Sequence, residues 1–163
     1  SRRKSGAKVR RLFATAWTIW LFDFATKTWA LTSLSSSEPR KIISSFLQLT
    51  LVHNPGAAFS FATGFTFVFS LLALAVVVAV VYFAPKITSG GWQLCIGLLL
   101  GGVLGNLTDR IFREPSFLNG HVIDWIQIPS WPVFNLADSA ICIAAFIAFV
   151  LSLRNVPPIT RVG

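Results

Sequence analysis

Acidic side chains are scarce in this sequence, which contains six aspartates and glutamates among 163 residues. Charged residues of both signs make up 12% of the chain, whereas a soluble domain carries about a quarter. Hydrophobic residues make up 54%, and the mean hydropathy is +0.69. This composition excludes an ordinary soluble domain and indicates a membrane protein.

Cysteine and histidine are also scarce, with two of each. Cys95 and Cys142 lie inside apolar stretches, without a partner at metal-binding spacing, so we interpret them as small packing residues. His53 and His121 lie in connecting segments, which leaves no credible Ser–His–Asp or Cys–His arrangement. His121 and Asp124 could supply two metal ligands, but no clear third is present. We therefore expect no metal and no cofactor.

Basic residues give the chain a net charge of +8, but they are not spread along a soluble surface. Six of the fourteen precede the first apolar stretch, which is typical of a cytoplasmic anchor and argues against nucleic-acid binding. Four apolar stretches are each long enough to cross a bilayer. They cover residues 12–32, 64–84, 92–109 and 133–153, with boundaries that are approximate.

An even number of crossings places both termini on one side of the membrane, in a single domain over residues 1–163. Nine basic residues fall on that side, and four fall in the opposite connections, 33–63 and 110–132. This excess predicts that the termini are cytoplasmic and that the two connections face outward.

Both outer connections contain stretches in which apolar and polar residues alternate, FLQLTLVHN at 46–54 and HVIDWIQI at 121–128. Such alternation is typical of β-strands. An Asn-Pro-Gly turn ends the first stretch at Gly56, and the small residues that follow would let another backbone approach closely. We predict an all-α membrane protein with four transmembrane helices and a small extracytoplasmic β-structure formed by the two outer loops.

All four aspartates lie inside or at the ends of apolar stretches, whereas both glutamates lie in polar connections. An ionisable residue within a membrane span is costly and is a functional-site hypothesis by default. Asp23 and Lys27 are spaced i,i+4 on one helix face, so we interpret them as an ion pair that supports a nearby site.

The third apolar stretch has three glycines spaced four apart, Gly97, Gly101 and Gly105. Small residues at this spacing are typical of closely packed membrane helices. Asn106, Asp109 and Arg110 follow at the outer boundary of the same stretch. We interpret Asp109 and Arg110 as a local charge network rather than as groups with a direct chemical role.

Asp124 and Asp138 are fourteen residues apart, with Pro129 and Pro132 between them. This length allows the chain to fold back and bring the two carboxylates together as an acid–base pair. Asn135 shares a helix face with Asp138 and can donate a hydrogen bond to a carboxylate or to a substrate carbonyl. Helix capping by Asn135 is the plain alternative, but capping leaves Asp138, further into the helix, unexplained.

Five stretches, taken in order, resemble lipoprotein signal peptidase, also called signal peptidase II. They are Asp23 with Lys27, NPGAAFS at 54–60, GGVLGNLTDR at 101–110, HVIDW at 121–125 and FNLAD at 134–138. The resemblance covers nearly the full length of the chain. One departure is Trp125, where the family more often has phenylalanine.

The resemblance implies a membrane aspartyl endopeptidase that removes the signal peptide from bacterial prolipoproteins, cleaving before a diacylglyceryl-modified cysteine. It implies that Asp124 and Asp138 are the catalytic pair and that no cofactor is needed. It also implies substrate-binding or supporting roles for Asp23, Lys27, Asn54, Gly56, Asn106, Asp109, Arg110 and Asn135.

The resemblance further implies the partners and the location of the protein. We expect a prolipoprotein substrate, membrane lipid, and globomycin-type inhibitors that occupy the space between the aspartates, with no nucleic acid. We expect a monomer in the bacterial cytoplasmic (inner) membrane, with its active site near the extracytoplasmic face.

Peptide hydrolysis without a metal or a nucleophilic side chain needs an activated water and a proton donor. Two neighbouring carboxylates cannot both ionise cheaply, so they share a proton. Either Asp124 or Asp138 could hold that proton at rest, because the apparent pKa values belong to the pair.

Two alternative interpretations come from other classes of protein. A small proton- or ion-coupled transporter also needs intramembrane aspartates, but its two halves usually resemble each other, and here they do not. A purely structural bundle treats the placement of four aspartates as coincidence. Both alternatives predict that Asp124→Asn or Asp138→Asn leaves prolipoprotein processing unchanged.

Overall fold

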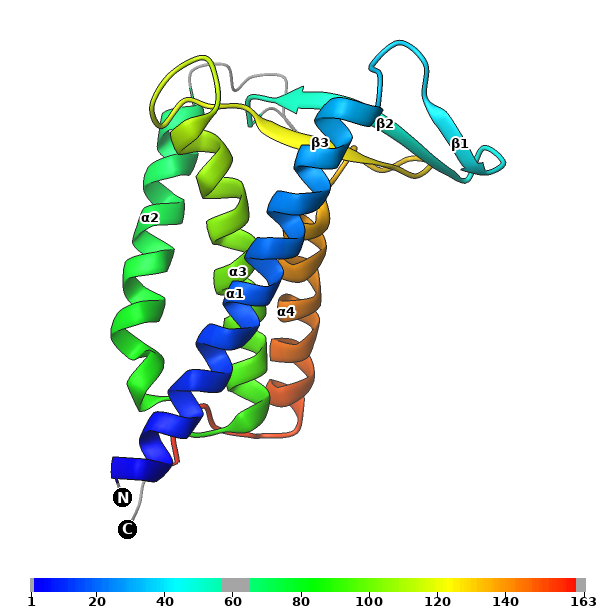
Figure 1. The fold of residues 1–163 in the computed structure, drawn as a ribbon. Helices are drawn as coiled ribbons and strands as arrows, with labels where there is room; N and C mark the ends of the chain where they lie inside the picture. Colours follow the sequence, from blue (N-terminus) through cyan, green and yellow to red (C-terminus); the bar gives the residue numbers. More distant parts are fainter. Residues whose placement is uncertain (1, 57–64, 161–163) are drawn as a thin grey trace.

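The computed structural model describes residues 2–56 and 65–160. The small residues at 57 and 58, predicted to allow close backbone approach, lie outside the described residues. Four helices form a bundle, and a three-stranded sheet lies across one end of it (Figure 1). The first helix begins at the other end, where the described part of the chain also finishes (Figure 1).

The helices are α1 (Arg2–Ser33), α2 (Thr66–Phe83), α3 (Gly90–Phe112) and α4 (Leu136–Leu153), with a 3-10 turn at Ala84–Lys86. Helices α2, α3 and α4 are predominantly apolar, whereas α1 mixes apolar with polar and charged residues. Within the described residues, three segments are long and apolar enough to cross a membrane: Thr66–Lys86, Gly90–Phe112 and Leu136–Leu153. Outward-facing side chains such as Val78 and Phe146 are apolar and well exposed, which is typical of a lipid-facing surface.

Helix α3 is the central element, because α1, α2 and α4 all pack against it. A Cβ atom built at Gly97 or Gly101 would lie 2.7 Å from a backbone oxygen of α1. At Gly102 it would lie 2.6 Å from a backbone oxygen of α4. At Gly105 it would lie 2.5 Å from the carboxylate of Asp23. The predicted close packing along the glycine stripe is therefore confirmed, and it brings α1 and α4 against adjoining faces of α3, which meet at Gly105.

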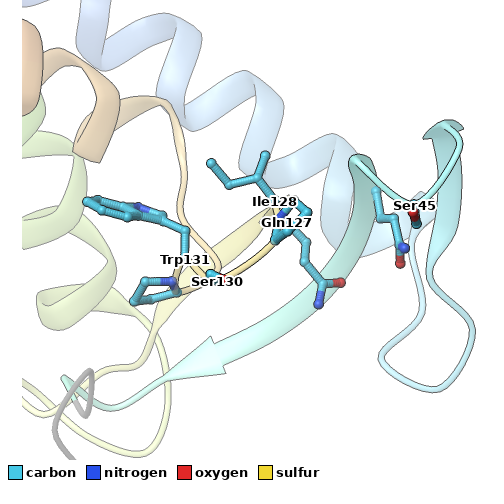
Figure 2. A pocket seen from close by; sticks show the side chains of 8 residues that line it. Ser45, Gln127, Ile128, Ser130 and Trp131 are labelled. Carbon is cyan, nitrogen blue, oxygen red and sulfur yellow. The ribbon is translucent and has the colours of Figure 1, made fainter.

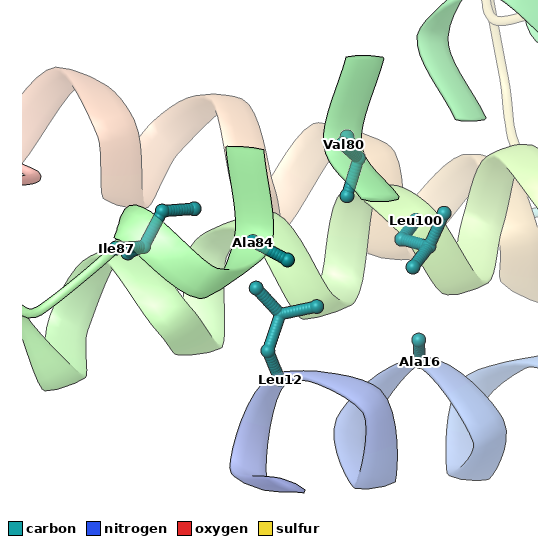
Figure 3. Close-up of a cluster of buried hydrophobic side chains, with 6 residues drawn as sticks. All are labelled: Leu12, Ala16, Val80, Ala84, Ile87 and Leu100. Atoms are coloured by element: carbon teal, nitrogen blue, oxygen red, sulfur yellow. The ribbon is translucent and has the colours of Figure 1, made fainter. Parts of the chain in front are cut away.

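A cluster of buried apolar side chains joins α1, α2 and α3 toward the end of the bundle that lies away from the sheet. It contains Leu12, Ala16, Val80, Ala84, Ile87 and Leu100 (Figure 3). Full burial of an aliphatic side chain contributes about 1.5–3 kcal/mol. This cluster leaves the opposite end of the bundle free for polar groups.

The sheet is antiparallel in the order β1-β2-β3, with β1 at Arg40–Ile43, β2 at Leu47–Asn54 and β3 at Val122–Gln127. The two strands predicted from alternation are confirmed as β2 and β3, one from each connection. Strand β1 was not predicted, because its four residues are all exposed and carry no burial pattern. In the β2–β3 pair, Asn54 lies opposite Val122, which is two residues from Asp124 along β3.

Candidate active site

The carboxylate of Asp124 is buried on β3, with 2% of the residue exposed. The side-chain amide of Asn54 donates to Asp124 Oδ2 at 2.9 Å, and that of Asn135 donates to Oδ1 at 2.7 Å. Asn54 is held in turn by the backbone, because its Oδ1 accepts from the N–H of Gly56 at 2.9 Å. The Asn-Pro-Gly turn thus aims an amide at the carboxylate.

The chain returns from β3 to α4 through a backbone bridge between Ile126 and Phe134. The Phe134 carbonyl accepts from the N–H groups of Trp125 and Ile126 at 3.0 and 2.9 Å, and Phe134 N–H donates to Ile126 O at 3.0 Å. This bridge folds the proline-containing segment back, as predicted, and places Asn135 beside Asp124.

Asp138 lies in the first turn of α4 and forms a capping box with Asn135. The Asp138 N–H donates to Asn135 Oδ1 at 2.9 Å, and the Asn135 N–H donates to Asp138 Oδ2 at 3.1 Å. The interpretation that capping leaves Asp138 unexplained is therefore wrong. The spacing Asn-x-x-Asp is a capping-box pattern, and that signal was present in the sequence.

The two carboxylates are connected through asparagine side chains. Asn106 of α3 donates to Asp138 Oδ1 at 2.9 Å. Asn106 Oδ1 accepts from the Asn135 amide at 3.1 Å, and that same amide reaches Asp124. Asn135 is fully buried, whereas Asn106 and Asp138 are half-buried, so the network runs from the interior to a partly accessible carboxylate. The structure therefore brings both predicted aspartates and three predicted asparagines into one site.

Beneath this network, Lys27 forms a buried cluster of charges. Its Nζ lies 2.6 Å from Asp23 Oδ2 and 2.8 Å from Asp109 Oδ2, and it donates to Asn106 Oδ1 at 3.0 Å. Asp23 Oδ1 accepts from the backbone N–H of Ala137 at 3.0 Å. The predicted Asp23–Lys27 pair is confirmed, and it also anchors the first turn of α4.

The charge network predicted for Asp109 and Arg110 forms with different partners. Asp109 Oδ1 lies 2.7 Å from Arg113 Nε, and Oδ2 accepts from the N–H of Ile123 at 3.1 Å. The reason is helical spacing, because residues four apart share a face and adjacent residues do not. The Arg110 guanidinium instead lies 5.9 Å from the ring of Phe69, and its buried Nε has no hydrogen-bond partner within the described part of the chain.

Burial raises the pKa of the Asp124 carboxyl from 3.8 to about 7. The hydrogen bond from Asn54 lowers this pKa, the charge of Asp138 raises it, and the hydrogen bond from Asn135 lowers it, each to a lesser extent than burial. A carboxyl with this pKa exchanges a proton near neutral pH, which suits general acid–base chemistry.

Beyond the end of β3, a cavity of about 620 Å³ opens at the distal part of the sheet (Figure 2). Gln127, Ser130 and Trp131 line it from one connection, and Ser45 and Gln48 line it from the other. No sequence motif marks these residues, because the cavity arises only when the two connections pair. Among the described residues, no group of three or more His, Cys, Asp or Glu side chains is placed to hold a metal ion.

Two carboxylates joined through buried amides at the end of an apolar bundle can supply a substrate with both an acid and a base. The fold and the site together define a membrane enzyme of the acid–base class. A family model described as "Signal peptidase (SPase) II" matches residues 15–154. The chain belongs to the signal peptidase II family.

Several bacterial relatives agree with this assignment. The chain is 46% identical over 146 residues to a lipoprotein signal peptidase of Leifsonia xyli, covering 89% of this chain and 68% of the relative. It is 44% identical over 147 residues to that of Rhodococcus jostii, covering 90% and 74%. It is 42% identical over 157 residues to that of Streptomyces coelicolor, covering 96% and 77%.

Solved structures show the same fold. One bacterial membrane enzyme superposes with a TM-score of 0.77 at 28% identity, over 93% of this chain and 94% of the other. A second superposes with a TM-score of 0.76 at 30% identity, over 88% and 92%. The resemblance seen in the sequence is confirmed: the chain is a multi-pass membrane peptidase, and the transporter alternative is not supported.

Proposed function

We propose that the chain is an aspartyl endopeptidase that removes the signal peptide from bacterial prolipoproteins, cleaving before the diacylglyceryl-modified cysteine. The observation that carries the proposal is the pair of carboxylates, Asp124 and Asp138, linked by Asn106 and Asn135 at one end of the bundle. Family membership supplies the class of substrate.

In the proposed mechanism, Asp124 holds the shared proton and Asp138 is ionised. The burial that raises the pKa of Asp124 to about 7 supports its role as the proton donor. Asp138 takes a proton from water as the water oxygen attacks the scissile carbonyl carbon, and Asp124 gives its proton to the carbonyl oxygen. When the C–N bond breaks, the proton on Asp138 passes to the leaving nitrogen, and one hydroxyl of the tetrahedral intermediate returns its proton to Asp124, so the carboxyl product forms and both aspartates regain their starting states.

The remaining polar residues have positioning roles in this proposal. Asn54, Asn106 and Asn135 orient the carboxylates through the hydrogen bonds described above. Asp23, Lys27 and Asp109 hold the helices beneath them, and Gly56 anchors Asn54. Among the residues that the structure describes, none accepts a hydrogen bond from the buried Nε of Arg110, which supports a role in binding a substrate carbonyl.

We also propose that the chain crosses the bacterial inner membrane four times, with cytoplasmic termini. Helix α1 is the fourth span, since the ion pair of Asp23 with Lys27 lowers the cost of inserting it. The surplus of basic residues near the termini supports this orientation. The active site then lies near the extracytoplasmic face, and the acyl chains of the substrate stay in the bilayer. We expect a monomer and inhibition by globomycin-type peptides.

The test is cleavage of a diacylglyceryl-modified prolipoprotein by the purified protein in detergent, with a metal chelator present. Asp124→Asn and Asp138→Asn should each lower the rate by several orders of magnitude, because each removes the acid or the base. Glu38→Gln, which changes an exposed carboxyl in the first connection, should cleave like wild type. Thermal unfolding must show that all three variants are folded. Substantial cleavage by either folded aspartate variant would mean that the catalytic pair is assigned wrongly.

A further inference from the structure

An apolar groove lies between α1, α2 and α3, away from the carboxylates. Its cavity measures about 410 Å³, and almost all of its lining is apolar. The walls and floor come from three helices: Phe13, Ala16, Trp17 and Trp20 of α1, Val77 and Val81 of α2, and Leu100 and Leu104 of α3. Helices α1 and α2 both pack on α3 and diverge from each other along the bundle (Figure 1).

One wall of the groove is held rigid by aromatic stacking. The rings of Trp17 and Trp20 stack with centroids 5.3 Å apart, and Trp20 stacks on Phe24 at 5.5 Å. The indole N–H of Trp20 donates to Thr108 Oγ1 at 2.9 Å, so it leaves no unsatisfied donor toward the groove. A dry, preformed apolar groove suits a hydrocarbon ligand and excludes a polar one.

The size of the groove decides which hydrocarbon occupant it suits. A helix has a diameter of about 10–12 Å and rises about 5.4 Å per turn, so this volume corresponds to about one helical turn. The groove therefore has room for only about one turn of a second protein helix. A single extended acyl chain is much narrower and can lie along it. In a membrane, an unfilled groove would forfeit dispersion contacts along its whole lining.

The groove has a positive charge at the end where the chain begins. Arg10 is exposed and precedes Phe13, Trp17 and Trp20 by three, seven and ten residues, so it lies on the same face of α1. We propose that the groove binds one acyl chain of an anionic phospholipid from the leaflet on the side of the termini, with the phosphate beside Arg10. Basic residues at the mouth of a groove between membrane helices are a recurrent setting for anionic headgroups.

The test is native mass spectrometry of the purified full-length protein with an equimolar mixture of phosphatidylglycerol and phosphatidylcholine of identical acyl chains. Wild type should retain one phospholipid and prefer the anionic one by about fivefold, the effect of about one basic residue near a membrane surface. Val81→Trp should fill the groove and lose most of the bound lipid. Leu72→Trp places the same side chain two and a half turns away on the opposite face of α2 and should retain it.

A second pair of variants tests the headgroup separately. Arg10→Gln should keep the bound lipid but lose the preference for the anionic headgroup, while Arg154→Gln, at the same end of the bundle on α4, should keep both. A photoreactive acyl chain should label Phe13–Trp20 and Val77–Val81 in wild type. Equal lipid retention by Val81→Trp and Leu72→Trp, or labelling spread evenly over all four helices, would overturn the proposal. None of these residues touches the carboxylates, so prolipoprotein cleavage serves as the check that each variant is folded.

Discussion

The side-chain amide of Asn135 connects the two segments that carry the carboxylates. Its oxygen accepts from the N–H of Asp138, and its nitrogen donates to Asp124 and Asn106. An amide supplies a donor and an acceptor at once, which no carboxylate or hydrocarbon of similar size can do. Because Asn135 is fully buried, water cannot replace a lost partner. This one residue therefore sets how the two acids lie relative to each other.

At the scale of single residues, the two aspartates of the site were easier to predict from the sequence than the residues that contact carboxylates. Asp124 and Asp138 were found because carboxylates are costly at a membrane boundary, whatever surrounds them. Asn106 was noted at the outer boundary of the third apolar stretch, but it and Asn54 were given a role in the site only through the resemblance. Arg113 was missed as the partner of Asp109, although their i,i+4 spacing is visible in the sequence.

The raised pKa of Asp124 predicts a pH-dependent difference in stability. The carboxyl has an ordinary pKa of 3.8 and a folded-state pKa of about 7, so the folded state holds the proton to higher pH. Its contribution to stability is complete below about pH 4 and is lost as the pH rises through 7. Asp124→Asn removes this dependence. Relative to wild type, the variant should gain stability between pH 5 and pH 8, by about 3 kcal/mol at most.

Thermal or denaturant unfolding in one detergent at pH 5 and pH 8 measures this difference. The altered hydrogen bonding of the new amide adds an offset that is the same at both pH values, so only the change with pH is read. Glu38→Gln, an exposed carboxyl, should track wild type throughout. If Asp124→Asn also tracks wild type, Asp124 is ionised at neutral pH and the proposed assignment of the proton is wrong.

At the scale of helices and strands, the sequence predicted the elements that leave a local residue pattern, and it missed those that depend on pairing with a distant segment. Strands β2 and β3 were both predicted, because apolar and polar residues alternate in their sequences. Strand β1 depends on pairing with β2, as in Arg40 opposite Leu49, and its exposed residues show no alternation. The glycine stripe predicted close packing, but not which helix lies on which side, because that depends on how α1 and α4 are arranged around α3.

Close packing at the glycines predicts different outcomes for two glycine-to-alanine changes in α3. A Cβ at Gly101 would meet the Ala16 carbonyl oxygen and Ile19 Cβ at 2.7 Å, so Gly101→Ala must push α1 away. Overpacking of this kind costs about 1–3 kcal/mol. At Gly90 a Cβ meets only the flexible end of Arg11 at 3.3 Å, so Gly90→Ala should leave stability unchanged or slightly higher.

Thermal unfolding of both glycine variants in the same detergent makes this comparison. Alanine is favoured over glycine by about 1 kcal/mol in a helix interior, where Gly101 lies, and by less at the first position, where Gly90 lies. Helix propensity alone would therefore favour Gly101→Ala, so a lower unfolding temperature for that variant reports packing. Equal unfolding temperatures would show that α1 and α3 are not held as closely as the structure has them.

At the scale of the whole molecule, the buried charge cluster ties three helices together under the site. Lys27 belongs to α1, Asp109 to α3, and the Ala137 N–H held by Asp23 begins α4. The Asp23–Lys27 pair could be predicted because it is local, whereas the partner on α3 depends on how the helices assemble. Lys27 also donates to Asn106, and Asn106 donates to Asp138, so the packing of the helices affects how Asp138 is oriented.

This arrangement predicts that removing the positive charge of Lys27 alone lowers the stability of the fold more than removing the charges of Lys27 and Asp23 together. Lys27→Met leaves the buried carboxylates of Asp23 and Asp109 with less compensation, and breaking a buried pair costs about 3–5 kcal/mol. Adding Asp23→Asn removes one of those charges and keeps an acceptor for the Ala137 N–H. The double variant should therefore be more stable than Lys27→Met alone, because Asp109 still pairs with Arg113.

Thermal unfolding and prolipoprotein cleavage of the two single variants and the double variant complete a double-mutant cycle. Stability should recover in the double variant more than activity does, because neither new side chain restores the hydrogen bond from Lys27 Nζ to Asn106. If the two single effects simply add, Asp23 and Lys27 are not coupled, and Lys27 acts on stability through its contacts with Asp109 and Asn106 of α3 instead. Recovery of stability with cleavage still impaired would separate the two contributions of Lys27: it neutralises the buried carboxylates, and it orients the amide that reaches Asp138.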